Sequence, residues 1–264
     1  MKIHYQLNDI DNALNKLPIE KGSTVFLHSN IGFFGNLAGE NNPDFISSIF
    51  YEKIMDKLGQ NGTIVVPAFT YSFPRNELFD PSLPILSMGV FSDFIRKHRN
   101  SYRSLDPCYS VCAIGKLAKK MTVNASENSF DNTSFFARFL NANGVILNLN
   151  FDAGSTFLHY VERTLNVPYR YDKTFEGHII QNGEKKLIKS TIYVRDINSD
   201  QTKPRFENFT LLVREKKLFR TTVLGRGQIG CINAVDCELI LKEILPKRPW
   251  LLTEADISGK VPLL

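Results

Sequence analysis

Short apolar runs alternate with amphipathic segments along the first two thirds of this sequence, and this alternation restricts the fold more than any other feature. Residues 24–29 (TVFLHS), 62–70 (GTIVVPAFT) and 144–151 (GVILNLNF) have the β-branched and apolar content of buried strands. Residues 45–59 and 133–144 instead repeat apolar residues at helical spacing and end in a glycine, which commonly stops a helix. Thr133 or Asn132 is the expected N-cap of the second of these helices. Strands that alternate with helices predict an α/β layer architecture.

The last third of the chain has a different pattern. Residues 173–197 alternate apolar and polar side chains on both sides of Asn182-Gly183, a dipeptide that favours a tight hairpin turn. Residues 206–218 have a helical pattern, and a further helix is expected to start near Ala234. No linker divides the sequence. We therefore predict one domain over residues 1–264, a three-layer α/β/α fold with a mixed central sheet and a β-rich C-terminal lobe.

The composition excludes several classes of protein. Hydrophobic residues make up 43% of the chain and charged residues 22%, a profile typical of a soluble globular protein. No apolar run has membrane-spanning length, no secretory signal begins the chain, and the four cysteines lack a paired CxxC zinc pattern. These features predict a cytoplasmic protein with no membrane partner and no metal. The net charge of +5 is scattered, which argues against nucleic acid but suits an anionic ligand such as a nucleotide or coenzyme.

The segment DAGSTFLHYVE, residues 152–162, is the strongest candidate for chemistry. A predicted strand delivers the chain to it, and Ser155 or Thr156 can cap a helix that runs to about Asn166. His159 and Glu162 then share one face of that helix. A carboxylate that accepts a proton from one ring nitrogen leaves the other nitrogen free as a base. Open α/β sheets also bind ligands at the carboxyl ends of their strands.

Other interpretations of this segment remain open from the spacing alone. A His-x-x-Glu pair occurs on many helices as a surface contact worth about half a kcal/mol or less. Zinc binding would require a further ligand from elsewhere in the chain. The sequence contains no GxSxG elbow and no P-loop, and residues 225–230 (GRGQIG) do not follow a strand-turn-helix start.

Six segments spread over most of the chain resemble one known family. In order, they are 22–35, 59–73, 86–115, 132–140, 146–162 and 224–236, and the fifth contains Thr-x-x-His-x-x-Glu. They are similar to the aminoglycoside 3-N-acetyltransferase family, which transfers acetyl from acetyl-CoA to an amine. The first segment has His28-Ser29-Asn30 where the family usually has His-Ser-Ser.

The resemblance implies roles for individual residues. His159 would be the general base on the acceptor amine, Glu162 would orient it, and Thr156 would lie close to the thioester. Four further residues would hold the pantetheine and phosphates of acetyl-CoA: His28, Ser29, Asn30 and Ser110. Direct transfer would require neither a metal nor a covalent acyl-enzyme.

Departures from the family pattern bear on the acceptor. Asp152 lies one place before the position, here Ala153, where the family commonly has an acidic residue. Tyr169 and Arg170 follow the candidate catalytic helix, and aromatic plus basic residues there suit a sugar nucleotide. We also assign Tyr71, in the loop after the second strand, to the acceptor site. Surface charges and core tyrosines are the ordinary alternative for this segment.

The first hypothesis is therefore an acyl-CoA-dependent N-acyltransferase acting on an amino sugar, with a nucleotide-linked amino sugar preferred. The second is an aminoglycoside 3-N-acetyltransferase. A non-catalytic CoA or sugar-nucleotide binding protein is the alternative from another class, and a thioesterase is a more distant one. The sequence is compatible with a homodimer. It leaves open whether Asp152 or Glu162 orients His159.

Overall fold

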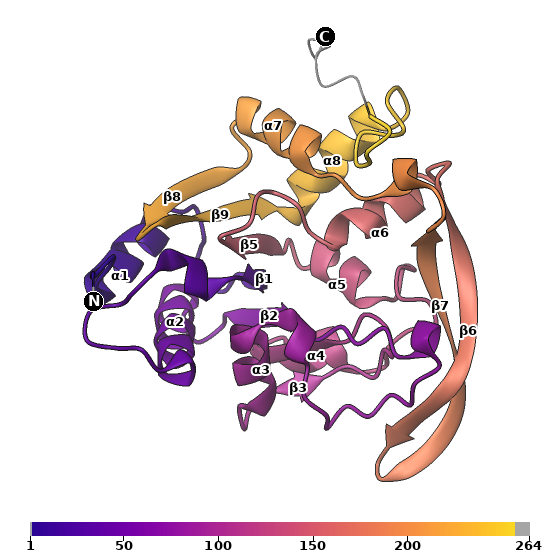
Figure 1. The fold of residues 1–264 in the computed structure, drawn as a ribbon, viewed down its shortest axis with the longest axis horizontal. Coiled ribbons are helices and arrows are strands. Elements are labelled where there is room, and N and C mark those ends of the chain that lie inside the picture. Colours follow the sequence, from indigo (N-terminus) through magenta and orange to yellow (C-terminus); the bar gives the residue numbers. More distant parts are fainter. Residues whose placement is uncertain (1, 257–264) are drawn as a thin grey trace.

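A mixed seven-stranded sheet lies at the centre of the protein, whose computed structural model describes residues 2–256 (Figure 1). From one edge to the other, the strands are β3 (Tyr102–Arg103), β4 (Val111–Gly115), β2 (Thr63–Pro67), β1 (Thr24–Ser29), β5 (Val145–Leu149), β9 (Gly227–Asn233) and β8 (Arg220–Leu224). β1 runs parallel to β2 and β5, while β4 and β9 flank these three strands in the antiparallel sense. The predicted mixed sheet is confirmed.

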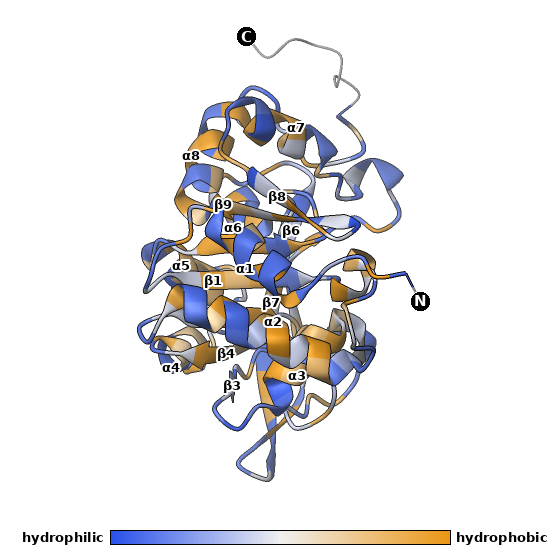
Figure 2. Ribbon diagram, turned by 90° about the vertical axis from the view of Figure 1, so that its left-hand side faces the viewer, coloured by the Kyte–Doolittle hydropathy of each residue, from blue (hydrophilic) through white to orange (hydrophobic). Residues whose placement is uncertain are grey.

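Helices cover both faces of this sheet, as predicted for three layers. Successive strand residues point to opposite faces, so Val25 and Leu27 pack on one side and Phe26 on the other. Figure 2 shows hydrophilic residues along the outward side of α1, the helix Leu7–Asn15. The Val25 side is covered by α1 (Leu7–Asn15), α2 (Pro43–Leu58) and α3 (Val90–Lys97). The Phe26 side is covered by α4 (Ala118–Thr122), α5 (Phe135–Asn141), α6 (Phe157–Thr164), α7 (Glu207–Glu215) and α8 (Ala234–Ile244).

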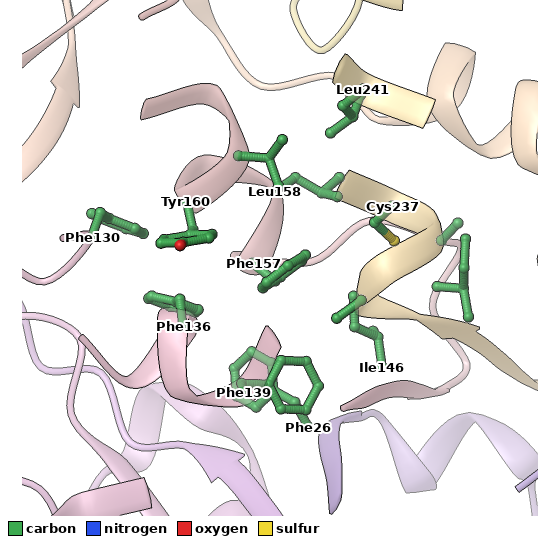
Figure 3. Close-up of a cluster of buried hydrophobic side chains, with 14 of the residues drawn as sticks. Phe26, Phe130, Phe136, Phe139, Ile146, Phe157, Leu158, Tyr160, Cys237 and Leu241 are labelled. Carbon is green, nitrogen blue, oxygen red and sulfur yellow. The ribbon is translucent and has the colours of Figure 1, made fainter. Parts of the chain in front are cut away.

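An aromatic cluster anchors α5 and α6 to the sheet. The ring of Phe26, on β1, lies 5.1 Å from that of Phe135 and 5.8 Å from that of Phe139, both edge to face. Phe139 in turn contacts Phe157, at the start of α6, with ring centroids 5.8 Å apart (Figure 3). These buried rings set where α6 begins relative to the end of β1.

A long hairpin stands beside the main sheet. β6 (Arg170–Gln181) and β7 (Glu184–Arg195) pair along their whole length. Asn182 and Gly183 make the turn with φ angles of 55° and 80°, the left-handed values that a type I′ turn requires. The predicted hairpin is thus confirmed. The C-terminal third also supplies β8 and β9 to the main sheet.

Three local features differ from the sequence-based expectations. Ser134 caps α5, because its hydroxyl accepts the N–H of Ala137, so neither Asn132 nor Thr133 is the cap. Helix α6 ends at Thr164, before Asn166, whose φ of 50° is incompatible with a continued helix. Helix α1 was not expected from the sequence. Short 3-10 turns occur at Ile31–Phe34, Phe73–Arg75, Leu86–Met88 and Asp200–Thr202. Among the described residues, no helix is long and apolar enough to cross a membrane.

Two asparagines shape the loop that leaves β5 and leads to α6. The side-chain amide of Asn148 donates to the carbonyls of Asp152 and Gly154. Asn150 donates to the carbonyl of Asn30 at 2.9 Å and accepts the N–H of Gln228 at 3.0 Å. The loop is therefore tied to itself, to the end of β1 and to β9.

Gly227 is the position where this arrangement requires a glycine. A Cβ atom there would lie 1.7 Å from Oδ1 of Asn150, which is far inside van der Waals contact. We expect Gly227→Ala to lower the free energy of unfolding by about 1–3 kcal/mol through overpacking. Gly32→Ala is the matched control, since a Cβ atom added at Gly32 would have no other atom within 4 Å and the φ of this glycine is not positive. Urea unfolding of both variants measures the difference, and equal stabilities would contradict the role given to Asn150.

Candidate active site

The candidate site lies at the carboxyl ends of the parallel strands β1 and β5, where His28 is in register with Asn148. A pocket of about 610 Å³ opens at this edge. Ligand sites of open α/β sheets occupy the same position. The pocket is lined by His28, Phe151, Asp152, Gly154, Ser155, Thr156, Phe206 and Glu207.

Ser155 joins the end of β1 to the start of α6. Its hydroxyl accepts the N–H of Phe157 at 3.2 Å and lies 2.9 Å from Nε2 of His28. The side chain of Thr156 makes no capping hydrogen bond, so of the two predicted capping residues Ser155 supplies the oxygen. Burial lowers the pKa of His28 to about 4. His28 is therefore a neutral imidazole at pH 7.

His159 and Glu162 form a buried pair one turn into α6. Nδ1 of His159 lies 2.5 Å from Oε2 of Glu162, whose side chain is fully buried, while 12% of the histidine side chain is exposed. An ionised carboxylate can only accept, so Nδ1 carries the hydrogen and Nε2 keeps its lone pair. The aromatic rings of Phe130 and Phe206 flank the imidazole, with centroids at 6.4 and 5.8 Å.

Three partners stabilise the buried carboxylate of Glu162. Besides His159, the hydroxyl of Tyr169 donates to Oε1, and Nε of Arg170 forms an ion pair with Oε2 at 2.9 Å. Burial by itself raises the pKa of Glu162, but His159, Arg170 and Tyr169 together outweigh it and leave that pKa below its usual value. Glu162 therefore remains ionised at neutral pH.

The pKa of His159 is lowered. Burial is the largest cause, the Arg170 guanidinium adds to it, and the neighbouring Glu162 carboxylate opposes both. Nη2 of Arg170 lies 3.4 Å from Nε2 of His159, a long contact in which the guanidinium can only donate. The imidazole is consequently neutral at pH 7 with its lone pair on Nε2, the form that a general base requires.

The structure brings some of the predicted coenzyme residues together and not others. His28 and Thr156 line the pocket, and Ser29 and Asn30 follow His28 at the end of β1. The buried hydroxyl of Ser29 has no hydrogen-bond partner among the described residues. Ser110 is fully buried instead, and its hydroxyl donates to the carbonyl of Ala68 at the end of β2. Ser110 is therefore a structural residue and does not line the pocket.

The predicted acceptor residues are also separated. Tyr169 and Arg170 are 5% and 9% exposed and hold Glu162, so they cannot stack on a nucleotide or bind its phosphates as expected. Asp152 lies at the exposed rim of the pocket and pairs with Arg214 at 3.2 Å. The contact with His159 is therefore made by Glu162 and not by Asp152.

Tyr71 does not line the pocket and is connected to His159 through other aromatic rings. It has a left-handed φ of 50°, and its ring packs edge to face on Tyr109 with centroids 5.3 Å apart. Tyr109 packs on Phe130, which flanks His159. The buried Asp106 accepts the N–H groups of Cys108 and Tyr109, so it shapes this loop.

Several residues of the site gave no usable signal in the sequence. Phe206 and Glu207 line the pocket from the start of α7, some distance along the chain from the His159 segment. Asn150 lies in the segment 144–151 and Gly227 in the segment 225–230, but their close approach is seen only in the folded structure. Within residues 2–256, no group of three or more His, Cys, Asp or Glu side chains is arranged to hold a metal ion.

The partly buried His28 makes the stability of the protein sensitive to acid. Its pKa is about 4 in the folded state and about 6.5 in the unfolded chain, so the unfolded chain binds more protons between these values. We expect the free energy of unfolding to fall by about 3 kcal/mol from this residue as the pH drops from 7 to 4. His28→Gln removes this contribution. Urea unfolding at several pH values measures it, and an unchanged pH dependence in the variant would contradict the burial argument.

The sequence and the fold of this chain are similar to those of known proteins. The family model for aminoglycoside 3-N-acetyltransferase matches residues 26–245. Aminoglycoside N(3)-acetyltransferase III of Pseudomonas aeruginosa is 24% identical over 197 residues, which cover 67% of this chain and 70% of that protein.

Solved structures of similar proteins share the fold. The apoenzyme of AAC(3)-IVa has a TM-score of 0.75 at 24% identity, covering 96% of this chain and 92% of that one. AAC-IIIb with CoASH has a TM-score of 0.76 at 20% identity, covering 92% and 97%. AAC-VIa bound to sisomicin has a TM-score of 0.76 at 20% identity, covering 92% and 98%. The family model spans most of the sheet and the His159 segment, and the chain belongs to the aminoglycoside 3-N-acetyltransferase family of acetyl-CoA-dependent N-acetyltransferases.

Proposed function

We propose that this protein transfers the acetyl group of acetyl-CoA to an amino group of an aminoglycoside-type amino sugar, with His159 as the general base. The observation that carries the proposal is the state of His159 beside the pocket. Its Nδ1 is held by the buried Glu162, its Nε2 keeps a lone pair, and its pKa is lowered. A neutral imidazole at a strand-end pocket suits proton removal from an amine at pH 7.

The reaction is a direct transfer in this proposal. The amine attacks in its neutral form, after its ammonium proton has gone to solvent; its nitrogen forms a bond to the thioester carbon, and the carbon–sulfur bond breaks. As the nitrogen–carbon bond forms, the nitrogen gives one further proton to Nε2 of His159, which passes it to the departing thiolate of CoA. Glu162 stabilises the imidazolium that exists between these two steps, since its carboxylate lies 2.5 Å from Nδ1.

The pocket has features that suit the pantetheine arm of acetyl-CoA. Its volume of about 610 Å³ lies in the range of small-molecule sites. Gly154, Ser155 and Thr156 give one wall small side chains, and the unpartnered hydroxyl of Ser29 lies at the adjacent strand end. His28, Ser29, Asn30 and Thr156 are the residues that would hold the coenzyme. AAC-IIIb, a similar structure, contains CoASH.

The acceptor proposal changes with the structure. The argument for a nucleotide-linked sugar depended on Tyr169 and Arg170, and both are buried against Glu162. Two carboxylates, Asp152 and Glu207, line the pocket instead, each with a side chain 63% exposed. Asp152 pairs with Arg214 and Glu207 with Arg205, but these are exposed pairs, and each carboxylate can exchange its arginine for an ammonium group of an amino sugar. A similar structure, AAC-VIa, contains sisomicin.

Replacement of His159 tests the catalytic assignment. We expect His159→Gln to reduce kcat by about 10²- to 10⁴-fold, because a positioned general base contributes that much to a proton transfer. Release of the CoA thiol from acetyl-CoA, followed with a kanamycin-type acceptor, measures the loss. His178→Gln is the matched control, since His178 is exposed on the hairpin, and it retains wild-type turnover. Near-normal turnover of His159→Gln would refute the assignment.

An acceptor panel separates the candidate activities. We expect thiol release with aminoglycosides and not with amino-sugar nucleotides, because no described basic or aromatic side chain of 169–170 is free to bind a nucleotide. Release that requires no acceptor would indicate a thioesterase. Binding of CoA without release in the presence of any amine would indicate a non-catalytic protein.

A further inference from the structure

Arg170 bridges both members of the His159–Glu162 pair. It is the first residue of β6, and its side chain is 5% exposed. Its Nε lies 2.9 Å from Oε2 of Glu162, the same oxygen that Nδ1 of His159 contacts at 2.5 Å. Its Nη2 lies 3.4 Å from Nε2 of His159, and its Nη1 donates to the carbonyl of Tyr193 at 3.3 Å. One guanidinium therefore spans the carboxylate, the ring and the neighbouring strand β7.

The charges around His159 explain why a bridging cation is needed. A fully buried carboxylate in contact with Nδ1 favours the protonated imidazole, because the two charges would neutralise each other. A protonated His159 cannot accept a proton from an amine. Arg170 supplies the positive charge that balances the Glu162 carboxylate, so the imidazole of His159 can stay unprotonated.

The other groups near His159 are uncharged, so the charge balance around the imidazole depends on Glu162 and Arg170. Tyr169 donates to Oε1 of Glu162, and burial together with the Glu162 carboxylate keeps the pKa of that tyrosine raised, so it carries no charge. From the loops after β2 and before β4, Tyr71 and Tyr109 face Arg170, and burial raises the pKa of each. Phe130 and Phe206 contribute only apolar surface.

We propose that Arg170 is a positioning residue that keeps His159 unprotonated by acting as the permanent counter-ion of Glu162. The proposal rests on His159 being the base in the proposed function. Arg170 takes no part in bond making or breaking in this mechanism, and its contacts with the His159–Glu162 pair are the ion pair with Glu162 and the long contact of Nη2 with Nε2 of His159. Its effect passes through the protonation state of the imidazole.

The test is a titration of His159 in the full-length protein by ¹⁵N NMR of the histidine rings, with its signals assigned by their loss in His159→Gln. In the wild type we expect a neutral ring with hydrogen on Nδ1 at pH 7 and a midpoint below about 6.5. Arg170→Gln raises the midpoint by about one to three pH units, because the protonated imidazole then becomes the counter-ion of Glu162. For the same reason we expect this variant to fold at pH 6, where that charged pair is intact.

A matched control is Arg163→Gln. Arg163 lies on the same helix and pairs with Asp172 at 2.7 Å, away from Glu162, so its removal leaves the His159 midpoint unchanged. In activity assays, kcat/KM of Arg170→Gln at pH 6.5 falls about tenfold for each unit of midpoint shift and recovers at higher pH. A merely structural arginine would lower activity equally at every pH.

Several outcomes overturn the proposal. If His159 is protonated at pH 7 in the wild type, the proposal is wrong. It is also wrong if Arg170→Gln folds and the titration midpoint of its His159 is unchanged. Because the NMR titration needs no substrate, it remains decisive if acetyl transfer is not found. Acetyl transfer that depends on His159 but not on Arg170 would leave the proposed function intact and remove only this inference.

Discussion

The buried negative charge of Glu162 is the constraint on which the rest of the site depends. A carboxylate removed from water costs several kcal/mol unless it is paired and hydrogen-bonded. Here Tyr169 donates a hydrogen bond to one of its oxygens and His159 to the other, while Arg170 adds an ion pair. These partners come from α6, from the segment that follows it and from the first residue of β6. The hairpin is therefore held beside the main sheet through the Glu162 carboxylate, which also orients His159.

The second constraint is the position of α6 relative to the parallel strands. Aromatic packing of Phe26, Phe139 and Phe157 sets the helix on the sheet, and the amides of Asn148 and Asn150 hold the loop before it. Ser155 then joins that loop to the neutral His28 on β1. As a result, the pocket walls and His159 belong to one connected set of buried contacts.

Much of the architecture could be predicted because its signals are local. Apolar runs of strand length, helical spacing before a glycine and the Asn182-Gly183 turn each act within a few residues. The helix boundaries were less accurate, because the capping of α5 by Ser134 depends on one hydrogen bond that the pattern does not distinguish from capping by Thr133. Helix α1 does have a sequence signal that the prediction overlooks, because Leu7, Ile10 and Leu14 recur at helical spacing and Ile10 and Leu14 are buried.

The candidate site could be predicted only in part. His159 and Glu162 share a helix, so their spacing indicates their contact. Tyr169 and Arg170 were expected to face a ligand, but aromatic and basic residues after a helix fit a buried carboxylate equally well, and the choice depends on long-range packing. Ser110 lies away from the pocket lining, and its burial against Ala68 depends on the packing of the whole sheet. Phe206 and Glu207 reach the pocket from a distant segment.

A crystal structure of the protein with bound CoA tests the central claim most directly. The claim is that the pocket at the carboxyl ends of β1 and β5 holds the thioester beside the unprotonated Nε2 of His159. The account predicts the pantetheine arm in the pocket lined by His28 and Thr156, with its sulfur beside Thr156 and facing His159. A CoA molecule bound elsewhere, with its sulfur remote from His159, would contradict it.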